Sequence, residues 1–302
     1  MIRRPDACLA APKSLDMPPQ SIFLFSVDLE DVRSMIAGGE RLKERVPGNV
    51  ERFVAFLARH RMQATFFTVG DIARRYPSLI RKLVDMGHEV ACHGSDHLTL
   101  DRHNPASFRD DLERNLDDLS NAGAQDVKGF RAPVFSLNVQ TAWAYRQLAD
   151  LGFSYSSSVL PAKSPLYGWP GFQPEPQRVD SSIWEIPPTL ASLPGLKVPV
   201  AGGVYFRVLP FWLIRHRFRQ QVKTGKPLVG YLHPYDIDTE QEPLMHPRLN
   251  GNHLLNWLMY RNRKGVFRRL EKLISSGARI MTYSEFVQTH LDPSGTVPPS
   301  SP

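Results

Sequence analysis

The sequence contains few cysteines and no long apolar segment. Cys8 and Cys92 are the only cysteines among 302 residues, and they form no CxxC pair. They are too few for a disulfide framework or a cysteine-rich structural zinc site, and they favour a reducing compartment. No run approaches the ~18 consecutive apolar residues of a membrane span. The N-terminus has basic residues without an apolar core, so we expect no secretory signal and a cytoplasmic location.

The charge balance is basic. The 37 Lys and Arg residues exceed the 30 Asp and Glu residues, which gives a net charge of +7. Such an excess favours anionic partners such as acidic glycans, phospho-sugars or a membrane surface. No nucleic-acid-binding motif accompanies the basic residues, so we expect no nucleic-acid partner. Two densely basic stretches, 215–226 and 261–272, are typical of solvated helix faces.

Strand-like and helix-like patterns alternate along most of the chain. Apolar runs at 22–27, 64–69, 127–130, 227–232 and 278–282 predict strands, and helical spacing separates several of them. Serial βα units predict an α/β fold with a mostly parallel sheet, closed into a barrel. We predict one domain at 21–290 with an irregular proline-rich insertion at 161–199. Residues 1–20 are a flexible arm in this prediction, and residues 291–302 are a flexible tail.

Two histidines four residues apart suggest a metal site. His93 and His97 follow a predicted strand at 88–92, and Asp28, Glu30 and Asp31 form an acidic cluster at the end of the strand predicted at 22–27. Imidazole and carboxylate groups suit zinc and similar divalent ions. Two histidines with one carboxylate leave coordination positions open, which is typical of catalytic sites.

Four reactive residues are predicted to converge on one face. Asp28, His93, Arg131 and His233 each lie at the C-terminal end of a predicted strand. In parallel α/β barrels that face carries the active site. Two aspartates after His233, at positions 236 and 238, either orient this histidine or cap the loop.

Four segments in this order resemble the polysaccharide deacetylase (NodB-like) superfamily, carbohydrate esterase family 4. They are Ser-Val-Asp-Leu-Glu-Asp at 26–31, His-Gly-Ser-Asp-His at 93–97, Phe-Arg-Ala-Pro at 130–133 and Tyr-Leu-His-Pro at 231–234. Segments 184–187 and 202–207 resemble a branch that includes exosortase-associated exopolysaccharide deacetylases and cytoplasmic-type peptidoglycan deacetylases. The resemblance implies a distorted (β/α) barrel of about seven strands.

The resemblance also implies metal-dependent N-deacetylation. The expected substrate is an acetamido sugar in a bacterial surface polysaccharide or its lipid-linked precursor. Removal of a formyl group from a lipid-linked amino sugar is the alternative reaction, and a non-catalytic glycan-binding relative is the alternative class. Peripheral contact with a membrane surface is compatible with either reaction, and the sequence gives no oligomeric state.

Roles for individual residues follow from the resemblance. Asp28 is the expected general base, and Arg131 pairs with it and lowers its pKa. The backbone N–H of Val134 is the expected oxyanion donor, and His233 is the expected acid for the departing amine. Zinc is the expected metal, with cobalt or nickel as alternatives.

The third metal ligand is open between two carboxylates. His93 and His97 supply the imidazoles. Related branches carry Asp-x-Asp in the first motif, which places Glu30 in register as the preferred ligand. Asp31 would take this role if the strand end were bulged.

Three aromatic residues are predicted to contact the sugar. Phe135 follows the Arg-Ala-Pro motif, where Val134 replaces the aromatic residue usual in the family. Tyr205 and Trp184 lie in the branch-specific segments, although core packing is an equally good explanation of Trp184. Ser156 stands where relatives often carry Asp.

Overall fold

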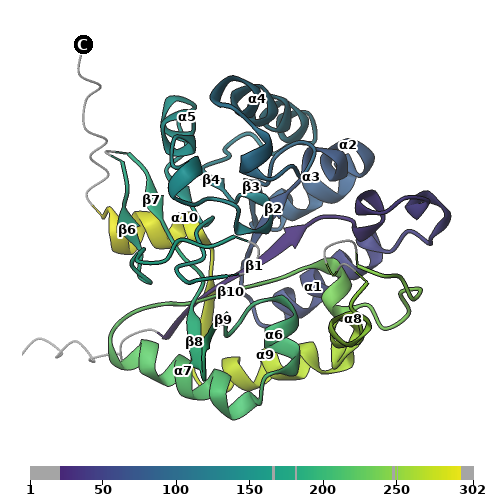
Figure 1. Ribbon diagram of the computed structural model, residues 1–302, viewed down its shortest axis with the longest axis vertical. Coiled ribbons are helices and arrows are strands. Elements are labelled where there is room, and N and C mark those ends of the chain that lie inside the picture. Colours follow the sequence, from purple (N-terminus) through teal and green to yellow (C-terminus); the bar gives the residue numbers. More distant parts are fainter. Residues whose placement is uncertain (1–20, 165–166, 181, 247–248, 250, 294–302) are drawn as a thin grey trace, which may run out of the picture.

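One curled sheet forms the centre of the molecule. The computed structural model describes residues 21–164, 167–180, 182–246, 249 and 251–293, so the predicted arm and most of the predicted tail lie outside the described residues. Among the described residues, the sheet has nine strands: eight run in the order β10-β1-β2-β3-β4-β5-β7-β6, and the ninth, β11, pairs with β1 (Figure 1). All pairings are parallel except that of β6 with β7. The strands are β1 Ser21–Leu29, β2 Thr65–Thr68, β3 Glu89–Cys92, β4 Gly129–Phe130, β5 Tyr155–Ser156, β6 Gln177–Arg178, β7 Trp184–Glu185, β10 Leu228–Leu232 and β11 Ala278–Met281.

The sheet curls into a distorted half-barrel. After β7 the chain returns to β10, where the Thr189 amide donates to Val229 O at 3.0 Å and Gly202 forms an isolated bridge with Tyr231. The α/β distorted-barrel prediction is therefore confirmed, with more strands than the expected seven or so. The proline-rich segment 161–199 adds short β6 and β7 and a separate hairpin of β8 (Leu190–Leu193) and β9 (Leu196–Pro199).

Helices cover the outside of the sheet. In Figure 1, α2 to α5 gather beside β2, β3 and β4, and α7 and α9 lie on the opposite side of the molecule. Gly87 has a φ of 77° directly beyond α3, as expected of a glycine that ends a helix. The helices are α1 Val46–Arg59, α2 Gly70–Arg75, α3 Pro77–Asp85, α4 Pro105–Asn121, α5 Ala144–Asp150, α6 Gly203–Val208, α7 Phe211–Lys223, α8 His253–Tyr260, α9 Val266–Ile274 and α10 Tyr283–Phe286.

The core lies on both faces of β1. Phe23 and Phe25 pack with Phe53 of α1, and on the other face Leu24 packs near Phe67. Burial of both faces explains the nearly continuous apolar run at 22–27. Among the described residues, the structure contains no helix whose length and apolar content would let it span a bilayer.

Candidate active site

The predicted site residues meet at the carboxyl edge of the sheet. Asp28 is the penultimate residue of β1, His93 follows β3, Arg131 follows β4 and His233 follows β10. Asp28, His93 and His233 line one cleft of about 310 Å³, and Arg131 is buried beside Asp28. The predicted convergence is therefore present in the fold, because the carboxyl ends of adjacent parallel strands lie at one edge.

Glu30, His93 and His97 form a cluster with the geometry of a metal site. Their ligand atoms all lie within 4.8 Å of one another. Glu30 Oε2 is 2.5 Å from His97 Nε2 and 3.8 Å from His93 Nε2. His93 Nδ1 lies 2.7 Å from the carbonyl oxygen of Arg131, so this nitrogen carries the proton and Nε2 keeps its lone pair for a ligand. The donor set fits a divalent ion with bonds of about 2.0–2.2 Å.

The histidines also lower the pKa of Glu30. Burial alone would raise the pKa of its carboxyl group, but His97, His93 and His233 hold that pKa well below its ordinary value. Glu30 is therefore a carboxylate at neutral pH, as a metal ligand must be.

The loop that carries the histidines is fixed by α4. The side chain of Asn115 donates to the Gly94 carbonyl at 2.7 Å, and Asp111 accepts from the Ser95 amide at 3.0 Å. Gly94 has a φ of 74°, and a Cβ at this position would lie 2.9 Å from Asp111 Oδ2. His97 is itself left-handed, with a φ of 54°. The tight turn between the two histidines therefore requires glycine at position 94.

We expect Gly94→Ala to weaken zinc binding by about tenfold or more, because the added methyl group pushes Asp111 away and shifts His97, as loss of an outer-shell contact does. Gly152→Ala is the matched control, since Gly152 also has a positive φ, of 80°, but has open space around its Cβ. Zinc affinity by competition titration and thermal unfolding are measured for both variants. Unchanged zinc affinity in Gly94→Ala would show that the turn does not position the ligands.

Asp31 lies outside the metal cluster. It caps the 3₁₀ turn Val32–Met35, where its carboxylate is 2.8 Å from Arg33 Nη2 and 3.2 Å from Arg75 Nη2. Glu30 points toward the histidines instead. The structure thus places Glu30 in the position of the third ligand, and the alternative assignment to Asp31 does not fit, because two arginines already hold its carboxylate on the other side of the chain.

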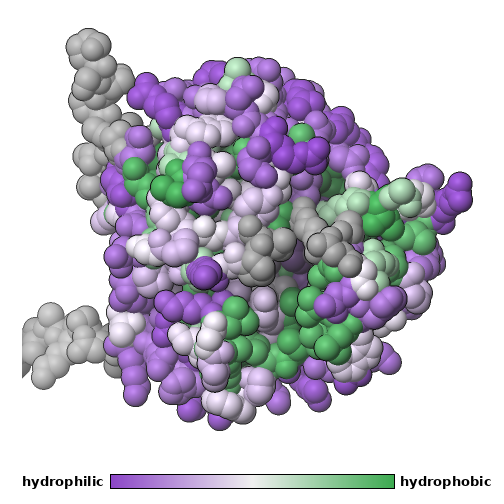
Figure 2. Space-filling view, viewed as in Figure 1, coloured by the Kyte–Doolittle hydropathy of each residue, from purple (hydrophilic) through white to green (hydrophobic). Residues whose placement is uncertain are grey.

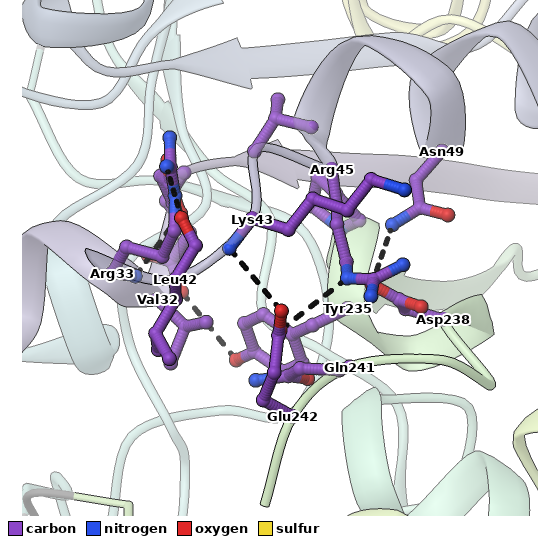
Figure 3. Close-up of a pocket in the computed structure, with 14 residues that line it drawn as sticks. Val32, Arg33, Leu42, Lys43, Arg45, Asn49, Tyr235, Asp238, Gln241 and Glu242 are labelled. Atoms are coloured by element: carbon purple, nitrogen blue, oxygen red, sulfur yellow. Dashed lines mark hydrogen bonds and ion pairs between the residues drawn. The ribbon is translucent and has the colours of Figure 1, made fainter. Parts of the chain in front are cut away.

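The segment after Asp31 forms one wall of the site. A small pocket of about 20 Å³ lies there, and its lining includes Glu30 and Tyr235. Figure 3 shows Tyr235 there beside Glu242 and Gln241. Arg33 donates to the Leu42 carbonyl at 3.0 Å, and the Lys43 amide donates to Glu242 at 3.2 Å. The first bond lies within the segment and the second ties it to the loop after β10, so hydrogen bonds hold the wall behind Glu30, to which Val32, Leu42 and Val46 add apolar contact.

Asp28 and Arg131 form a buried ion pair. Arg131 Nη1 is 2.5 Å from Asp28 Oδ1, and both side chains are almost fully buried. Ser157 Oγ and Tyr283 OH accept from the same guanidinium, each at 2.9 Å. Burial alone would lower the pKa of Arg131, but Asp28 and Tyr283 raise it. The guanidinium therefore stays charged and fixes the orientation of the Asp28 carboxylate.

His233 belongs to a buried chain of charges. Its Nδ1 lies 2.9 Å from Asp236 Oδ2, and the same oxygen accepts from the His233 amide at 2.8 Å. Asp236 Oδ1 in turn lies 2.8 Å from Arg207 Nε, and both of these side chains are fully buried. The other face of the histidine stacks on Tyr235 with ring centroids 4.6 Å apart. Nε2 is thereby aimed at the cleft, 3.9 Å from Asp28 Oδ2.

The surrounding carboxylates favour the protonated form of His233. Burial alone would lower its pKa, but Asp236, Glu30 and Asp28 raise the pKa of His233 to about 9. Burial would likewise raise the pKa of Asp236, but Arg207 and His233 bring the pKa of Asp236 down to about 2. Of the two aspartates considered from the sequence, Asp236 orients the histidine, whereas Asp238 binds Asn49 and Arg45.

We expect Asp236→Asn to move the alkaline limb of the pH–rate profile to lower pH by about 1–2 units, since a hydrogen bond to a charged group contributes about 1.5–3 kcal/mol. The sign follows from the acid role: activity needs protonated His233 and falls as pH rises through its pKa. Loss of Asp236 lowers that pKa. Arg207→Gln removes the competing positive charge and should move the same limb upward. If the alkaline limb shifted in the same direction in both variants, or in neither, the role of this chain of charges would be contradicted.

The backbone after Arg131 is strained. Val134 has a φ of 61° and Phe135 a φ of 54°, and both residues line the cleft. A left-handed conformation is unfavourable for a β-branched residue, and strain of this kind clusters at functional sites. The structure thus places the predicted oxyanion donor on the cleft wall.

Two of the three predicted sugar-binding aromatics lie in the cleft. Phe135 and Tyr205 line it, whereas Trp184 packs on the guanidinium of Arg178 at 4.8 Å and against the core. Trp184 therefore does not line this cleft: its strand β7 lies six pairings away from β10 in the sheet order, and its side chain contacts the core. Cleft residues that sequence reasoning missed come from the loop after β5, from β9, from β10 and from the turn after β10: Lys163, Tyr167, Lys197, Tyr231 and Tyr235.

The fold and the site together define a class of protein. A curled parallel α/β sheet carries the donor set of a mononuclear metal site and a buried Asp–Arg pair at its carboxyl edge. Residues 41–153 match the family model for polysaccharide deacetylase, and residues 157–288 match a domain of unknown function, DUF3473. The chain therefore contains a polysaccharide deacetylase (NodB-like) domain followed by DUF3473, which agrees with the resemblance of its motifs. His233, Asp236 and Arg207 all lie in the part matched by DUF3473.

Named relatives match shorter stretches of the chain. A chitooligosaccharide deacetylase of Sinorhizobium fredii (strain NBRC 101917 / NGR234) is 38% identical over 105 residues, 32% of this chain and 47% of the relative. Another, of Bradyrhizobium sp. (strain ANU 289), is 45% identical over 56 residues, 18% of this chain and 26% of the relative. The chain thus spans less than half the length of these curated relatives.

A solved structure shows the same fold over nearly the whole chain. It is a Mycobacterium smegmatis protein provisionally assigned as a polysaccharide deacetylase, 20% identical, with a TM-score of 0.64. The match covers 96% of this chain and 97% of the other.

Proposed function

We propose that this protein hydrolyses the amide bond of N-acetylated sugars in a glycan and releases acetate. The observation that carries the proposal is the shared cleft of Asp28, the Glu30–His93–His97 cluster and His233. The match of residues 41–153 to the polysaccharide deacetylase model supports the same chemistry, and the two rhizobial relatives are named for deacetylation of chitooligosaccharides. The finer expectation, a surface polysaccharide or its lipid-linked precursor, is part of this proposal.

Glu30, His93 and His97 would hold the divalent metal on which the proposed reaction depends. Zinc suits the two imidazoles and one carboxylate, and cobalt or nickel would also fit. When bound, such an ion acts as a Lewis acid toward a carbonyl oxygen and lowers the pKa of water.

The remaining residues would manage protons and orientation. Asp28 would take a proton from the attacking water, while Arg131 holds its carboxylate in place. The amide N–H of Val134 would donate to the oxygen that gains negative charge as the carbonyl carbon becomes tetrahedral. His233 Nε2 would then protonate the departing sugar nitrogen as the C–N bond breaks, which leaves acetate and a free amine.

The cleft walls suit a sugar with nearby negative charge. Phe135, Tyr205 and Tyr231 present aromatic rings, which stack well on the apolar faces of sugars. The exposed Lys163 and Lys197 lie at the same cleft and would favour a glycan that carries carboxylate or phosphate groups.

The proposal is tested by measuring acetate release from N-acetylglucosamine oligomers and from an acidic N-acetylated polysaccharide. Release from either substrate, with a matching gain of free amines, is the expected result. Release of formate from a formamido sugar, with none of acetate from any acetamido sugar, would replace the acetyl substrate by a formyl one. Binding of these glycans without release of any acyl group would overturn the catalytic assignment.

A further inference from the structure

Helix α8 presents its apolar side chains to solvent. Leu254 is 68% exposed, Trp257 52% and Leu255 45%, and the helix buries none of its residues. Figure 2 shows hydrophobic patches on this face of the molecule, over α8 and over the β8–β9 hairpin. Three large apolar side chains on one eight-residue helix are unusual for a surface that meets only water.

The stretch of sequence that contains α8 carries charges of one sign. Between Glu242 and Glu271 the sequence contains no acidic residue. Exposed basic side chains follow the helix directly, at Arg261, Lys264 and Arg268. The guanidinium of Arg261 lies over the Trp257 ring at 4.5 Å, which combines apolar and cationic contact in one patch. A partner that covers this patch must therefore offer both apolar material and negative charge.

The patch adjoins the cleft. Met259 of α8 and Leu249 just before it line the cleft together with His233. The end of α8 is anchored to buried Arg207, whose Nη1 donates to the carbonyls of Met259 at 3.0 Å and Arg261 at 2.7 Å. Arg207 pairs with Asp236, so the exposed helix has a fixed position relative to the site.

We propose that α8 docks on the surface of an anionic lipid bilayer, with Leu254, Leu255 and Trp257 inserted at the level of the headgroups. Arg261, Lys264 and Arg268 then contact the lipid phosphates. The combination of leucine, tryptophan and flanking cations is the one that binds helices to the interface rather than across the membrane. Docking brings the cleft to the bilayer, and it does not depend on the proposed deacetylation.

Co-sedimentation of the full chain with vesicles tests this. Vesicles of phosphatidylcholine alone are compared with vesicles containing equal parts of phosphatidylglycerol, at low and high salt. We expect binding to the anionic vesicles, weakened by salt, and little binding to the zwitterionic ones. The triple variant Leu254→Ser, Leu255→Ser, Trp257→Ser should bind the anionic vesicles at least about tenfold more weakly than the wild type, because its apolar contact area is lost.

Two matched controls distinguish binding through this patch from nonspecific binding to vesicles. Val139→Ser changes an apolar residue that is 59% exposed on another element and should bind as wild type. The triple variant Arg261→Gln, Lys264→Gln, Arg268→Gln should lose its preference for anionic vesicles. The triple variant Arg215→Gln, Arg219→Gln, Lys223→Gln in α7 should keep it. Equal losses in the two basic sets would overturn the assignment to α8.

Two further results would also overturn the proposal. One is the absence of vesicle binding by the wild type. The other is a concentration-dependent dimer, seen by ultracentrifugation and lost in the serine variant, which would mean that a second copy covers α8. Turnover of soluble oligosaccharides is measured without vesicles, so failure of docking and failure of the proposed activity are distinguishable.

Discussion

Asp28→Asn is expected to slow acetate release by about 10²–10⁴-fold, the usual contribution of a general base. Asp28 faces the cleft, but it lies outside the Glu30–His93–His97 cluster, so the variant should bind zinc as tightly as the wild type. The asparagine side chain has nearly the same shape and cannot take up the proton. The measurements are the rate of acetate release at saturating zinc and the stoichiometry of bound zinc.

Asp31→Asn is the matched control. Asp31 and Asp28 are both buried aspartates paired with arginine. Asp28→Asn leaves the buried Arg131 without its carboxylate, whereas Asp31→Asn removes one partner from Arg33 and Arg75, which keep Glu44 and Asp71. Loss of stability is therefore expected in both variants, and thermal unfolding measures it. Only Asp28→Asn should lose turnover. A wild-type rate in Asp28→Asn, or an equal loss of rate in the two variants, would remove Asp28 as the base.

Glu30→Gln is expected to weaken zinc binding by more than about 100-fold, since even loss of an outer-shell partner costs about 10–100-fold. The substitution removes the only negative charge from a cluster whose other members are neutral imidazoles when they bind metal. Activity should fall in parallel and return in part at high zinc concentration. The affinity is measured by competition with a chelator of known strength.

The same titration on Asp31→Asn decides between the two carboxylates. We expect its zinc affinity to equal that of the wild type, because Arg33 and Arg75 hold Asp31 away from the histidines. The reverse pattern, with tight binding in Glu30→Gln and weak binding in Asp31→Asn, would assign the third ligand to Asp31 and require a different path of the chain after β1.

The reactive residues of the site were accessible from sequence because they follow strands. Asp28, His93, Arg131 and His233 each come directly after an apolar run, and in a parallel sheet such positions share one edge. Strand and helix periodicity therefore predicted both the architecture and the grouping of these side chains. It could not choose between Glu30 and Asp31, since a difference of one residue at the end of a strand depends on local turns and on the arginines that bind Asp31.

Features built by the region after residue 160 were harder to predict. Arg207 reaches Asp236 from a short helix, α6, that has no strong periodic pattern, and this contact is set by the tertiary fold alone. Trp184 was expected in the cleft, but short β7 pairs with β5 and leaves its side chain on the core. Helix α8 carries apolar residues but packs none of them fully into the core. Hydrophobic periodicity predicts a helix from one face that is buried, so it gave no signal for α8.

The most direct test of the central claim is a zinc titration of metal-stripped protein with acetate release followed at each step. The claim is that one ion, held by Glu30, His93 and His97, makes this cleft a deacetylase. It predicts that no acetate is released without metal, that the rate of release rises linearly as zinc is added, and that this rate saturates at one zinc ion per chain. Full acetate release by the metal-free chain, or stoichiometric zinc binding with no release from any acetamido sugar, would contradict it.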